Sequence, residues 1–538
     1  MSGKGGPTGL GTLFEHYAQR GHRTVFHLSR PFDFAPGLGT EFTVSTLAGL
    51  VEEASAWIHA AGARAGDRVA IAKGSHWDYL ILACAAARIG ALPVLVAGGL
   101  PADTLATVLK RAEPRVLITT AGILASSAEA GSDLTSLAEA VVSIDGPHPG
   151  VLDVADLRGG RVPPAVEAAP YEPMVASHTS GTTGVPKLVV HTADTILGHL
   201  GRTESIPWPI VGMKKKDTVA TAVAFNHMRM ITWSTGTLRL EPKRALILAD
   251  ADPATAERMF RRHRPTYLEA LPATYIGWEA LLDDPDAPDN VFSDVRLFVS
   301  TFDAMHPPTV RRFLHASRRP LPSWLQGWGQ SETGPMTFRL LTRRDLEEQG
   351  GRHPTTRDVG RPIPGFTKMA VVDPATMKRV PAGTPGVVLA RTNGRCVGYL
   401  GENERWRSKA LGRWWNTGDW GVVSRGGSYR LLDREVDVIP GMSCIELEDV
   451  LADRLPDLLE AVVIGIPGQL PLPVVCTRGG TWDEVAWQQA TADLPTLAEP
   501  LRLDWDDIPR TSTGKVRRLE LRERLLGEDA TFGTGRWT

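Results

Sequence analysis

The stretch Thr179-Ser180-Gly181-Thr182-Thr183-Gly184-Val185-Pro186-Lys187 brings two glycines, a run of hydroxyl side chains and one lysine together. Glycine lets the backbone approach a ligand closely, so backbone N–H groups, hydroxyls and an ammonium group can all meet the oxygens of a triphosphate. The spacing is not that of a Walker A loop, in which a lysine directly follows the second glycine. A surface loop rich in serine and threonine is the alternative, but Pro186-Lys187 favours a phosphate-binding loop.

Upstream of this stretch, helical and extended patterns alternate. Apolar residues at helical spacing between Leu47 and Ala61 predict an amphipathic helix, which Gly62 ends. The pattern then predicts a strand over 68–72, a helix over 79–89, a strand over 91–96, a helix near 104–111 and a strand over 115–119. Repeated strand–helix–strand units predict a mainly parallel sheet covered by helices, which is an α/β fold.

Length and charge limit the class of protein. The chain has 538 residues, more than one hydrophobic core usually serves, so two or more domains are expected. With 59 basic and 61 acidic residues the formal net charge is −2, and this balance favours neither nucleic acid nor an anionic membrane as partner. We therefore expect neither kind of partner.

Cysteine usage and apolar stretches bear on location. Cys84, Cys396, Cys444 and Cys476 are spread too widely for a disulfide framework or paired metal ligands, which fits a reducing compartment. The N-terminal residues lack the apolar core of a signal peptide. The most apolar stretch, 79–102, is interrupted by an arginine and a proline, so it predicts a buried helix and strand rather than a membrane span. We expect a cytoplasmic protein.

The C-terminal part has a pattern of its own. Residues 429–432 predict a short strand that runs into charged residues at 433–435, where we place a domain boundary. The boundary divides the chain into an N-terminal domain, 1–433, and a small C-terminal domain, 434–538. In the smaller domain the pattern predicts a strand over 461–466, a helix near 481–492 and a basic helix over 516–526.

Five motifs resemble those of the adenylate-forming superfamily, which comprises acyl- and aryl-CoA synthetases, luciferases and nonribosomal-peptide adenylation domains. In chain order they are Thr179–Lys187 (phosphate loop), Trp328-Gly329-Gln330-Ser331-Glu332 (aromatic-Gly-x-Thr-Glu segment), Thr417-Gly418-Asp419, Asp433-Arg434 (inter-domain hinge) and Pro509–Arg518 (C-terminal lysine loop). One short match arises easily by chance, whereas the whole ordered set does not. The resemblance implies a large N-terminal domain of mainly parallel sheets with a distorted β-barrel region, and a small, mobile α+β C-terminal domain.

The resemblance also implies cofactors and residue roles. ATP and Mg²⁺ would be the cofactors, with Glu332 as the metal ligand because a hard cation prefers carboxylate oxygen. Lys515, Glu332 and His227 would be catalytic: Lys515 would bridge the attacking acid and the α-phosphate, where a cation stabilises developing charge, and His227 would border the acid group. Trp328 would stack on adenine, and Asp419 would accept the ribose hydroxyls. The implied nucleotide-binding residues are Thr179, Ser180, Gly181, Thr182, Thr183, Gly184, Lys187, Asp303, Trp328, Gly329, Ser331, Asp419 and Arg434. The implied substrate pocket comprises His227, Arg229, Ser300, Thr301, Phe302 and Gly327.

Several departures from the family pattern bear on the substrate and on the acceptor. Where the family has a Gly-Gly-Ala-Pro-like segment, residues 300–305 read Ser-Thr-Phe-Asp-Ala-Met, which predicts a narrowed pocket suited to a small or flat aromatic acid. The hinge pivot position is Val436, and the loop 438–448, which in the family helps to form the CoA channel, is shortened. The C-terminal domain is shortened again between 466 and 482. Arg229 is an unusual charge near the expected pocket, where it could bind a second anion or face solvent.

Three functions remain open. The first is an AMP-forming carboxylate–CoA ligase that acts on a small aryl or acyl acid. The second keeps adenylation but passes the activated group to another acceptor, such as an amine or a carrier protein; ATP-dependent diazotases of secondary metabolism, which use nitrite and an aromatic amine, are of this kind. In both, an oxyanion attacks the α-phosphate in line, giving an AMP anhydride and pyrophosphate. The third is a non-catalytic nucleotide-binding protein, against which Lys515, Glu332 and Asp419 argue. The identity of the acid and acceptor, the use of CoA and the oligomeric state stay open.

Overall fold

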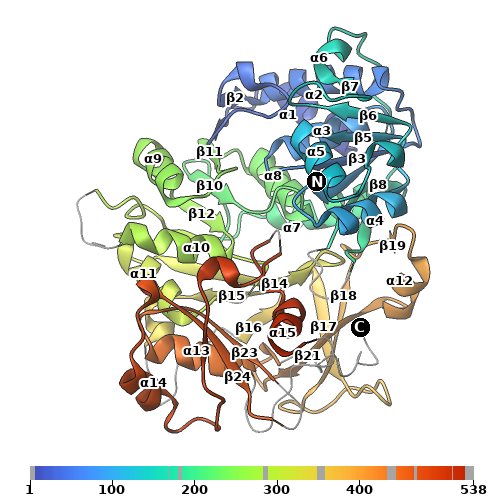
Figure 1. The fold of residues 1–538 in the computed structure, drawn as a ribbon. Coiled ribbons are helices and arrows are strands. Elements are labelled where there is room, and N and C mark those ends of the chain that lie inside the picture. The colour runs from blue at the N-terminus through green and yellow to red at the C-terminus, as the bar shows by residue number, and fades with distance from the viewer. Residues whose placement is uncertain are drawn as a thin grey trace. The chain divides into compact units, whose positions relative to one another are not determined.

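The computed structural model describes residues 6–167, 169–179, 185–282, 289–303, 305–347, 358–432, 444–465, 469–511 and 513–527. The chain divides into two compact units, shown as a ribbon in Figure 1. Unit 1 comprises 1–269, 331–334 and 393–408, and unit 2 comprises 270–330, 335–392 and 409–538. The domain boundary expected at 433 lies outside the described residues and stays a prediction.

Unit 1 contains an eight-stranded sheet with the strand order β19-β9-β8-β4-β3-β5-β6-β7. Neighbouring strands from β8 to β7 along this order are parallel, as the repeated strand–helix–strand pattern predicts. β9 is antiparallel to both β8 and β19. The strands are β3 (Arg68–Lys73), β4 (Leu92–Ala97), β5 (Val116–Thr119), β6 (Ala140–Ser143), β7 (Leu152–Asp153), β8 (Pro173–His178), β9 (Leu188–Thr192) and β19 (Gly398–Tyr399).

A second row of strands in unit 1 has the order β12-β10-β11-β1-β2. β11 is parallel to β1 and to β10, and β2 is antiparallel to β1. These strands are β1 (Val25–Leu28), β2 (Glu41–Thr43), β10 (Thr218–Ala222), β11 (Arg244–Ile247) and β12 (Tyr267–Ala270). The helices of unit 1 are α1 (Leu13–Ala18), α2 (Val44–Ala60), α3 (Asp78–Arg88), α4 (Ala102–Ala112), α5 (Ala121–Glu129), α6 (Val154–Leu157), the π-helix Asp194–Leu200, α7 (Gly201–Glu204), α8 (Met228–Leu240), α9 (Pro253–His263) and α12 (Asn403–Lys409).

The first helices and strands form where the sequence pattern predicts them. α2 begins after Thr43, whose side chain accepts a hydrogen bond from the Thr46 N–H, while the Thr46 hydroxyl accepts one from the Thr43 N–H; this capping box satisfies donors that a helix end leaves open. α3 is buried along nearly its whole length and packs on β3, β4 and β8, with α2 against its other side (Figure 1). No helix in the described part of the chain is both long and apolar enough to span a bilayer.

Unit 2 contains a row of strands with the order β17-β18-β21-β22-β16-β15-β14-β13, and β20 pairs with β21. Within the described residues the row does not close into a barrel, because β17 pairs with β18 on one side only and so forms an edge of the sheet. The mixed α/β class is confirmed, while the expected barrel region is an open sheet in this part of the structure. The strands are β13 (Leu297–Ser300), β14 (Ser323–Gln330), β15 (Gly334–Leu341), β16 (Asp358–Pro362), β17 (Thr367–Val372), β18 (Gly386–Thr392), β20 (Ala410–Leu411), β21 (Trp414–Val423) and β22 (Tyr429–Leu431).

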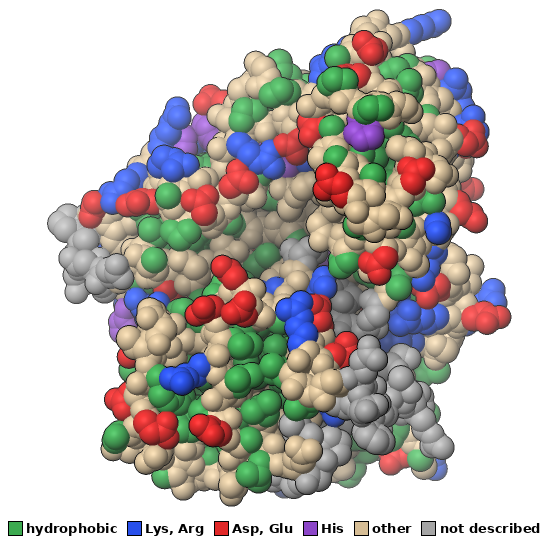
Figure 2. Space-filling model, in the orientation of Figure 1, with side chains coloured by type: hydrophobic (Ala, Val, Ile, Leu, Met, Phe, Trp, Pro, Cys, Tyr) green, Lys and Arg blue, Asp and Glu red, His purple; other side chains and the backbone are tan. Residues whose placement is uncertain are grey.

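A three-stranded sheet near the C-terminus has the order β23-β24-β25. Alternate residues of β23 face opposite sides, so Ala461 and Val463 join an apolar cluster with α13 and α14, while Val462 and Ile464 join one with α15. Figure 2 shows hydrophobic side chains gathered over β23 and β24, with acidic and basic side chains around them. The strands of this sheet are β23 (Leu458–Ile464), β24 (Leu472–Thr477) and β25 (Leu501–Arg502). The helices of unit 2 are α10 (Pro272–Trp278), α11 (Pro307–Ala316), α13 (Cys444–Arg454), α14 (Glu484–Thr491) and α15 (Arg518–Leu526).

Candidate functional site

The two ends of the phosphate loop are joined where β8 and β9 leave the sheet. The Thr179 N–H donates to the Lys187 carbonyl at 2.9 Å, and the Lys187 N–H donates to the Thr179 hydroxyl at 3.2 Å. These bonds extend the antiparallel β8–β9 ladder by one step, so the backbone of Lys187, directly before β9, is held in a fixed place. The predicted residues Ser180, Gly181, Thr182, Thr183 and Gly184 lie outside the described part of the chain.

Glu332, the predicted metal ligand, lies beside the lysine of this loop. Its carboxylate oxygen Oε1 accepts a hydrogen bond from the Tyr399 hydroxyl at 2.6 Å and lies 3.9 Å from Lys187 Nζ. The Lys187 ammonium is also 5.3 Å from the centre of the Tyr399 ring, within the range of a cation–π interaction. Burial and the neighbouring Glu332 raise the pKa of Tyr399, so its hydroxyl stays protonated and donates.

Ser331 is held from two sides by histidines. His227 precedes α8, where its Nδ1 accepts from the Arg229 N–H at 3.0 Å. Its Nε2 therefore carries the proton and donates to the Ser331 hydroxyl at 2.9 Å. His191 on β9 donates from Nε2 to the Ser331 carbonyl at 2.9 Å, and burial lowers the pKa of His191 to about 4, so that ring is neutral. Two neutral imidazoles thus fix the residue next to Glu332.

Arg229 neither faces solvent nor is open to a second anion, the two roles considered from the sequence. Its guanidinium binds Glu269 through two hydrogen bonds of 2.6 and 2.7 Å, and its Nη1 lies 2.5 Å from Glu204. The side chain is 12% exposed, and those of Glu204 and Glu269 are 11% and 0% exposed. Two carboxylates already balance this one cation, which disfavours a further anion.

In unit 2, β13 ends in the segment that departs from the family pattern. Ser300 is buried, and its hydroxyl accepts from the Trp324 indole N–H at 2.9 Å; its place in the substrate pocket stays a prediction. The Thr301 hydroxyl is buried and has no hydrogen-bond partner among the described residues. Phe302 has φ +83°, a region that favours glycine, and Asp303 is exposed. Phe302 therefore occupies a glycine-like backbone position with a bulky side chain.

The Phe302→Gly variant is expected to be more stable than the Phe302→Ala variant. At most positions the order is the reverse, because glycine loses more backbone entropy on folding than alanine does. Both changes remove the ring, but only glycine adopts φ +83° without steric cost, which is worth about 1–2 kcal/mol. Urea unfolding of the two variants checks this. An alanine variant at least as stable as the glycine variant would contradict the strained backbone.

The aromatic-Gly segment forms the end of β14. A side chain added at Gly327 would lie 3.5 Å from Thr301 and from Phe338, so this glycine leaves little spare room. Trp328 is half-buried and packs against the apolar cluster that contains Val388, and Gly329 is exposed. The Trp328 side chain, which is predicted to stack on adenine, thus packs in part against the hydrophobic core.

Asp419, the predicted ribose acceptor, is fixed by a residue of the same aromatic-Gly segment. Gln330 Nε2 donates to Asp419 Oδ2 at 2.9 Å and to the Thr417 carbonyl at 2.8 Å. The Asp419 N–H donates to the Thr417 hydroxyl at 3.1 Å, and Gly418 between them has φ +78°. The predicted Trp328–Glu332 and Thr417–Asp419 motifs are therefore in contact through Gln330, which was quoted in the motif without a role.

Lys515 lies in a compact turn. The Thr511 N–H donates to the Lys515 carbonyl at 2.8 Å, while the Thr511 hydroxyl accepts from the Lys515 N–H at 3.2 Å; Gly514, with φ +78°, allows the turn. Arg510 donates to the Gly514 carbonyl at 3.2 Å and to Glu460 of β23 at 2.9 Å, and its guanidinium stacks 3.8 Å from the Trp505 ring. The lysine loop is thus anchored to the C-terminal sheet.

The donor set suits magnesium held jointly with a nucleotide. Mg²⁺ is usually bound by one or two carboxylates together with water and substrate phosphates, rather than by an all-protein cage. Glu332 supplies such a carboxylate, and no group of three or more potential metal-binding side chains occurs in the described ranges. Glu332 therefore fits the role as a single protein ligand.

Some predicted and unpredicted residues need separate mention. Arg434 and the shortened loop up to 443 lie outside the described ranges, and α13 begins directly after them. His191 and Tyr399 carried no sequence signal, because each contacts a residue distant in the chain, Ser331 and Glu332 respectively. The four cysteines, all within the described residues, are buried thiols without disulfides, which agrees with their wide spacing.

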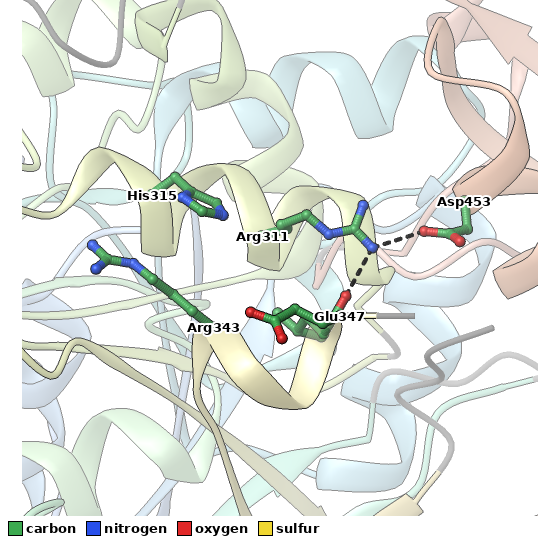
Figure 3. A pocket seen from close by; sticks show the side chains of 6 residues that line it. Arg311, His315, Arg343, Glu347 and Asp453 are labelled. Carbon is green, nitrogen blue, oxygen red and sulfur yellow. Dashed lines mark hydrogen bonds and ion pairs between the residues drawn. The ribbon is translucent and has the colours of Figure 1, made fainter. Parts of the chain in front are cut away.

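A cavity of about 350 Å³ in unit 2 lies apart from the motif residues. It is lined by Arg311, His315, Arg343, Leu346, Glu347 and Asp453 (Figure 3). Arg311 binds Asp453 at 2.9 Å and the Leu346 carbonyl at 3.1 Å, while Arg343 donates to carbonyls at the end of α11. Because both arginines already donate to protein acceptors, we assign this cavity no ligand.

Comparison with known proteins supplies an independent view. Residues 13–400 match the family model described as AMP-binding enzyme. The chain is 39% identical to 3-amino-2-hydroxy-4-methoxybenzoate diazotase of Streptomyces cremeus, over 97% of this chain and 96% of that protein. It is 27% identical to 4-hydroxybenzoate–CoA/benzoate–CoA ligase of Rhodopseudomonas palustris, over 87% of this chain and 86% of that one. The crystal structure of the anthranilate CoA ligase AuaEII with anthranoyl-AMP has a TM-score of 0.78 at 20% identity, covering 96% of this chain and 97% of that one.

Proposed function

Because this chain belongs to the AMP-binding enzyme family and is an AMP-forming, ligase-like enzyme, we propose that it is an ATP-dependent diazotase of secondary metabolism. Its substrates would be nitrite and an amino-substituted aryl acid. The observation that supports this proposal most strongly is the 39% identity, over nearly the full length of both chains, to a diazotase that acts on an aminobenzoate. Identity to the benzoate–CoA ligase is lower, at 27%. We further propose that the protein acts in the cytoplasm on small molecules, without nucleic acid or membrane partners.

The proposed reaction has two group transfers. A nitrite oxygen attacks the α-phosphorus of ATP, the bond from that phosphorus to the β-phosphate oxygen breaks, and pyrophosphate leaves. The aryl amine nitrogen then attacks the nitrosyl nitrogen of the nitrite–AMP anhydride, whose N–O bond breaks to release AMP, and the amine loses a proton. Loss of water from the resulting N-nitrosamine, with uptake of a proton, yields the diazonium group, and no oxidant or reductant is needed.

The predicted residues would act mainly by positioning and by charge. Lys515 would stabilise negative charge on the α-phosphate and the attacking oxygen. Lys187 and the residues of the phosphate loop would hold the outer phosphates, and Asp419 would accept the ribose hydroxyls. Mg²⁺, when bound, would neutralise charge on the phosphates and pyrophosphate, with Glu332 as its ligand. The neutral His227 would keep Ser331 oriented beside the substrate.

An aryl-CoA ligase is the second candidate, supported by the 27% identity to the benzoate–CoA ligase. It would share the adenylation step, with the aryl carboxylate as the attacking group, and would then use the CoA thiol as acceptor. The narrowed segment 300–303 suits a flat aryl acid in either case. The shortened loop at 438–448, expected from the sequence, favours the diazotase.

We expect nitrite to be required for turnover and CoA to have no effect. The measurement is release of pyrophosphate and AMP from ATP and Mg²⁺ with a panel of aminobenzoates, each run with nitrite, with CoA and with neither. ¹⁵N-nitrite should place its label in the product, detected by mass spectrometry, in the same amount as AMP. Turnover that needs CoA and ignores nitrite would instead establish the ligase. Absence of pyrophosphate in every arm would refute both.

A further inference from the structure

Tyr399 contacts two charged residues of the predicted phosphate and metal site through different parts of its side chain. The hydroxyl donates to Glu332 Oε1 at 2.6 Å, and the ring lies under the Lys187 ammonium at 5.3 Å from its centre. The side chain is fully buried, so both contacts are sheltered from water. Neither the motif pattern nor the comparisons give this tyrosine a role.

Short strand pairing explains why Tyr399 lies there. β19 is antiparallel to β9, with Tyr399 opposite Val189. Flanking bonds extend the pairing, because the Val397 N–H donates to the Val190 carbonyl and the Leu400 N–H to the Leu188 carbonyl, both at 2.9 Å. Tyr399 is therefore held beside β9, the strand that directly follows Lys187.

The same segment is also tied to the chain around Glu332. The Cys396 N–H donates to the Glu332 carbonyl at 2.7 Å, three residues before the tyrosine that binds the Glu332 side chain. The segment 396–400 thus links β9, the strand that follows Lys187, to Glu332. Both described contacts of that carboxylate fall on Oε1, while Oε2 receives none from the described residues.

We propose that Tyr399 is a positioning residue, which orients Glu332 toward the magnesium ion and keeps Lys187 directed at the phosphates. A carboxylate that binds a metal is usually hydrogen-bonded itself, and that outer partner controls its orientation. Without the tyrosine, Glu332 and Lys187, whose charged atoms are 3.9 Å apart, can pair directly and so withdraw from their ligands. The inference rests on the proposed ATP-dependent function.

Two substitutions separate the roles of the hydroxyl and the ring. Tyr399→Phe keeps the ring under Lys187 but removes the hydrogen bond to Glu332. We expect it to bind ATP normally in EDTA, and to need about 10–100-fold more Mg²⁺ to reach half of the magnesium-dependent gain in ATP affinity. Tyr399→Leu removes the ring as well, and should also weaken binding in EDTA by about two- to fivefold. Calorimetric titration of ATP at stepped Mg²⁺ concentrations measures both effects.

Tyr79→Phe is the matched control. Tyr79 is a fully buried tyrosine of the same unit whose hydroxyl contacts the Lys73 and Val96 carbonyls instead of a carboxylate. It should keep the wild-type magnesium dependence. An unchanged magnesium midpoint in Tyr399→Phe would overturn the proposal, and so would an equal loss of ATP affinity with and without Mg²⁺, which indicates a merely structural role. If the wild-type protein binds no ATP, the proposed function itself fails.

Discussion

Lys515→Ala should slow pyrophosphate release by about 10²–10³-fold, as the loss of one group that stabilises transition-state charge does. The lysine backbone is fixed by its turn with Thr511, so removal of the side chain should leave the loop intact. Affinity for ATP should change little, because the phosphate loop and Asp419 would carry most of it. Pyrophosphate release and equilibrium ATP binding, measured on the same preparation, check the two halves of this prediction.

Arg524→Ala provides the comparison for Lys515→Ala. Arg524 is a basic residue of the neighbouring helix α15, with a side chain 56% exposed and paired with Glu520. Its loss removes the same charge from the same region and should leave turnover near the wild-type rate. A wild-type rate in Lys515→Ala, or an equal fall in both variants, would remove the catalytic role of Lys515.

Arg229→Met is expected to lower the free energy of unfolding by about 3–5 kcal/mol, the usual cost of removing one partner from a buried ion pair. Methionine replaces the stem of the arginine but leaves Glu204 and Glu269 without their cation. Urea unfolding at neutral pH measures the loss. If Arg229 served mainly to bind an anionic substrate, stability would instead be retained and substrate affinity would fall.

The pH dependence of this variant tests the same explanation. Burial raises the pKa of Glu269 in the wild type even though Arg229 opposes the shift, so removal of Arg229 should raise it further. A carboxyl whose pKa is higher in the folded state than in the unfolded state favours folding when protonated. The destabilisation should therefore be small at acidic pH and grow as the pH rises through the raised pKa of Glu269. Arg229→Met combined with Glu204→Gln and Glu269→Gln should recover much of the stability at neutral pH.

The sequence predicted the parts of the fold that depend on local pattern. α2, α3 and the parallel strands β3 to β5 are confirmed. α2 has one apolar face at helical spacing, and α3 and the three strands are continuous apolar runs, buried along nearly their whole length, which the sequence also displays. The open sheet of unit 2 was not foreseen. Whether a sheet stays open depends on which strands pair with which, and β17 ends the row here. Pairing between strands leaves no local period in the sequence.

The candidate site shows the same division between local and distant information. Glu332 and Lys187 were found because they belong to recognisable motifs, and the structure brings them together within unit 1. The partners of Arg229 could not be found in this way, because Glu269 lies 40 residues further along the chain and no motif connects them. Tyr399 was missed for a related reason, since β19 is too short to produce an alternating pattern.

The anchoring of the lysine loop limits how Lys515 can move. Arg510 links the loop to β23 and to Trp505 by hydrogen bonds and stacking, so bending the loop alone would break several contacts of one arginine. The loop and the three-stranded sheet should therefore move together as one rigid body. Any rearrangement that carries Lys515 toward or away from a nucleotide would swing the whole sheet with it, and the pivot would have to lie before α13 rather than at the loop itself.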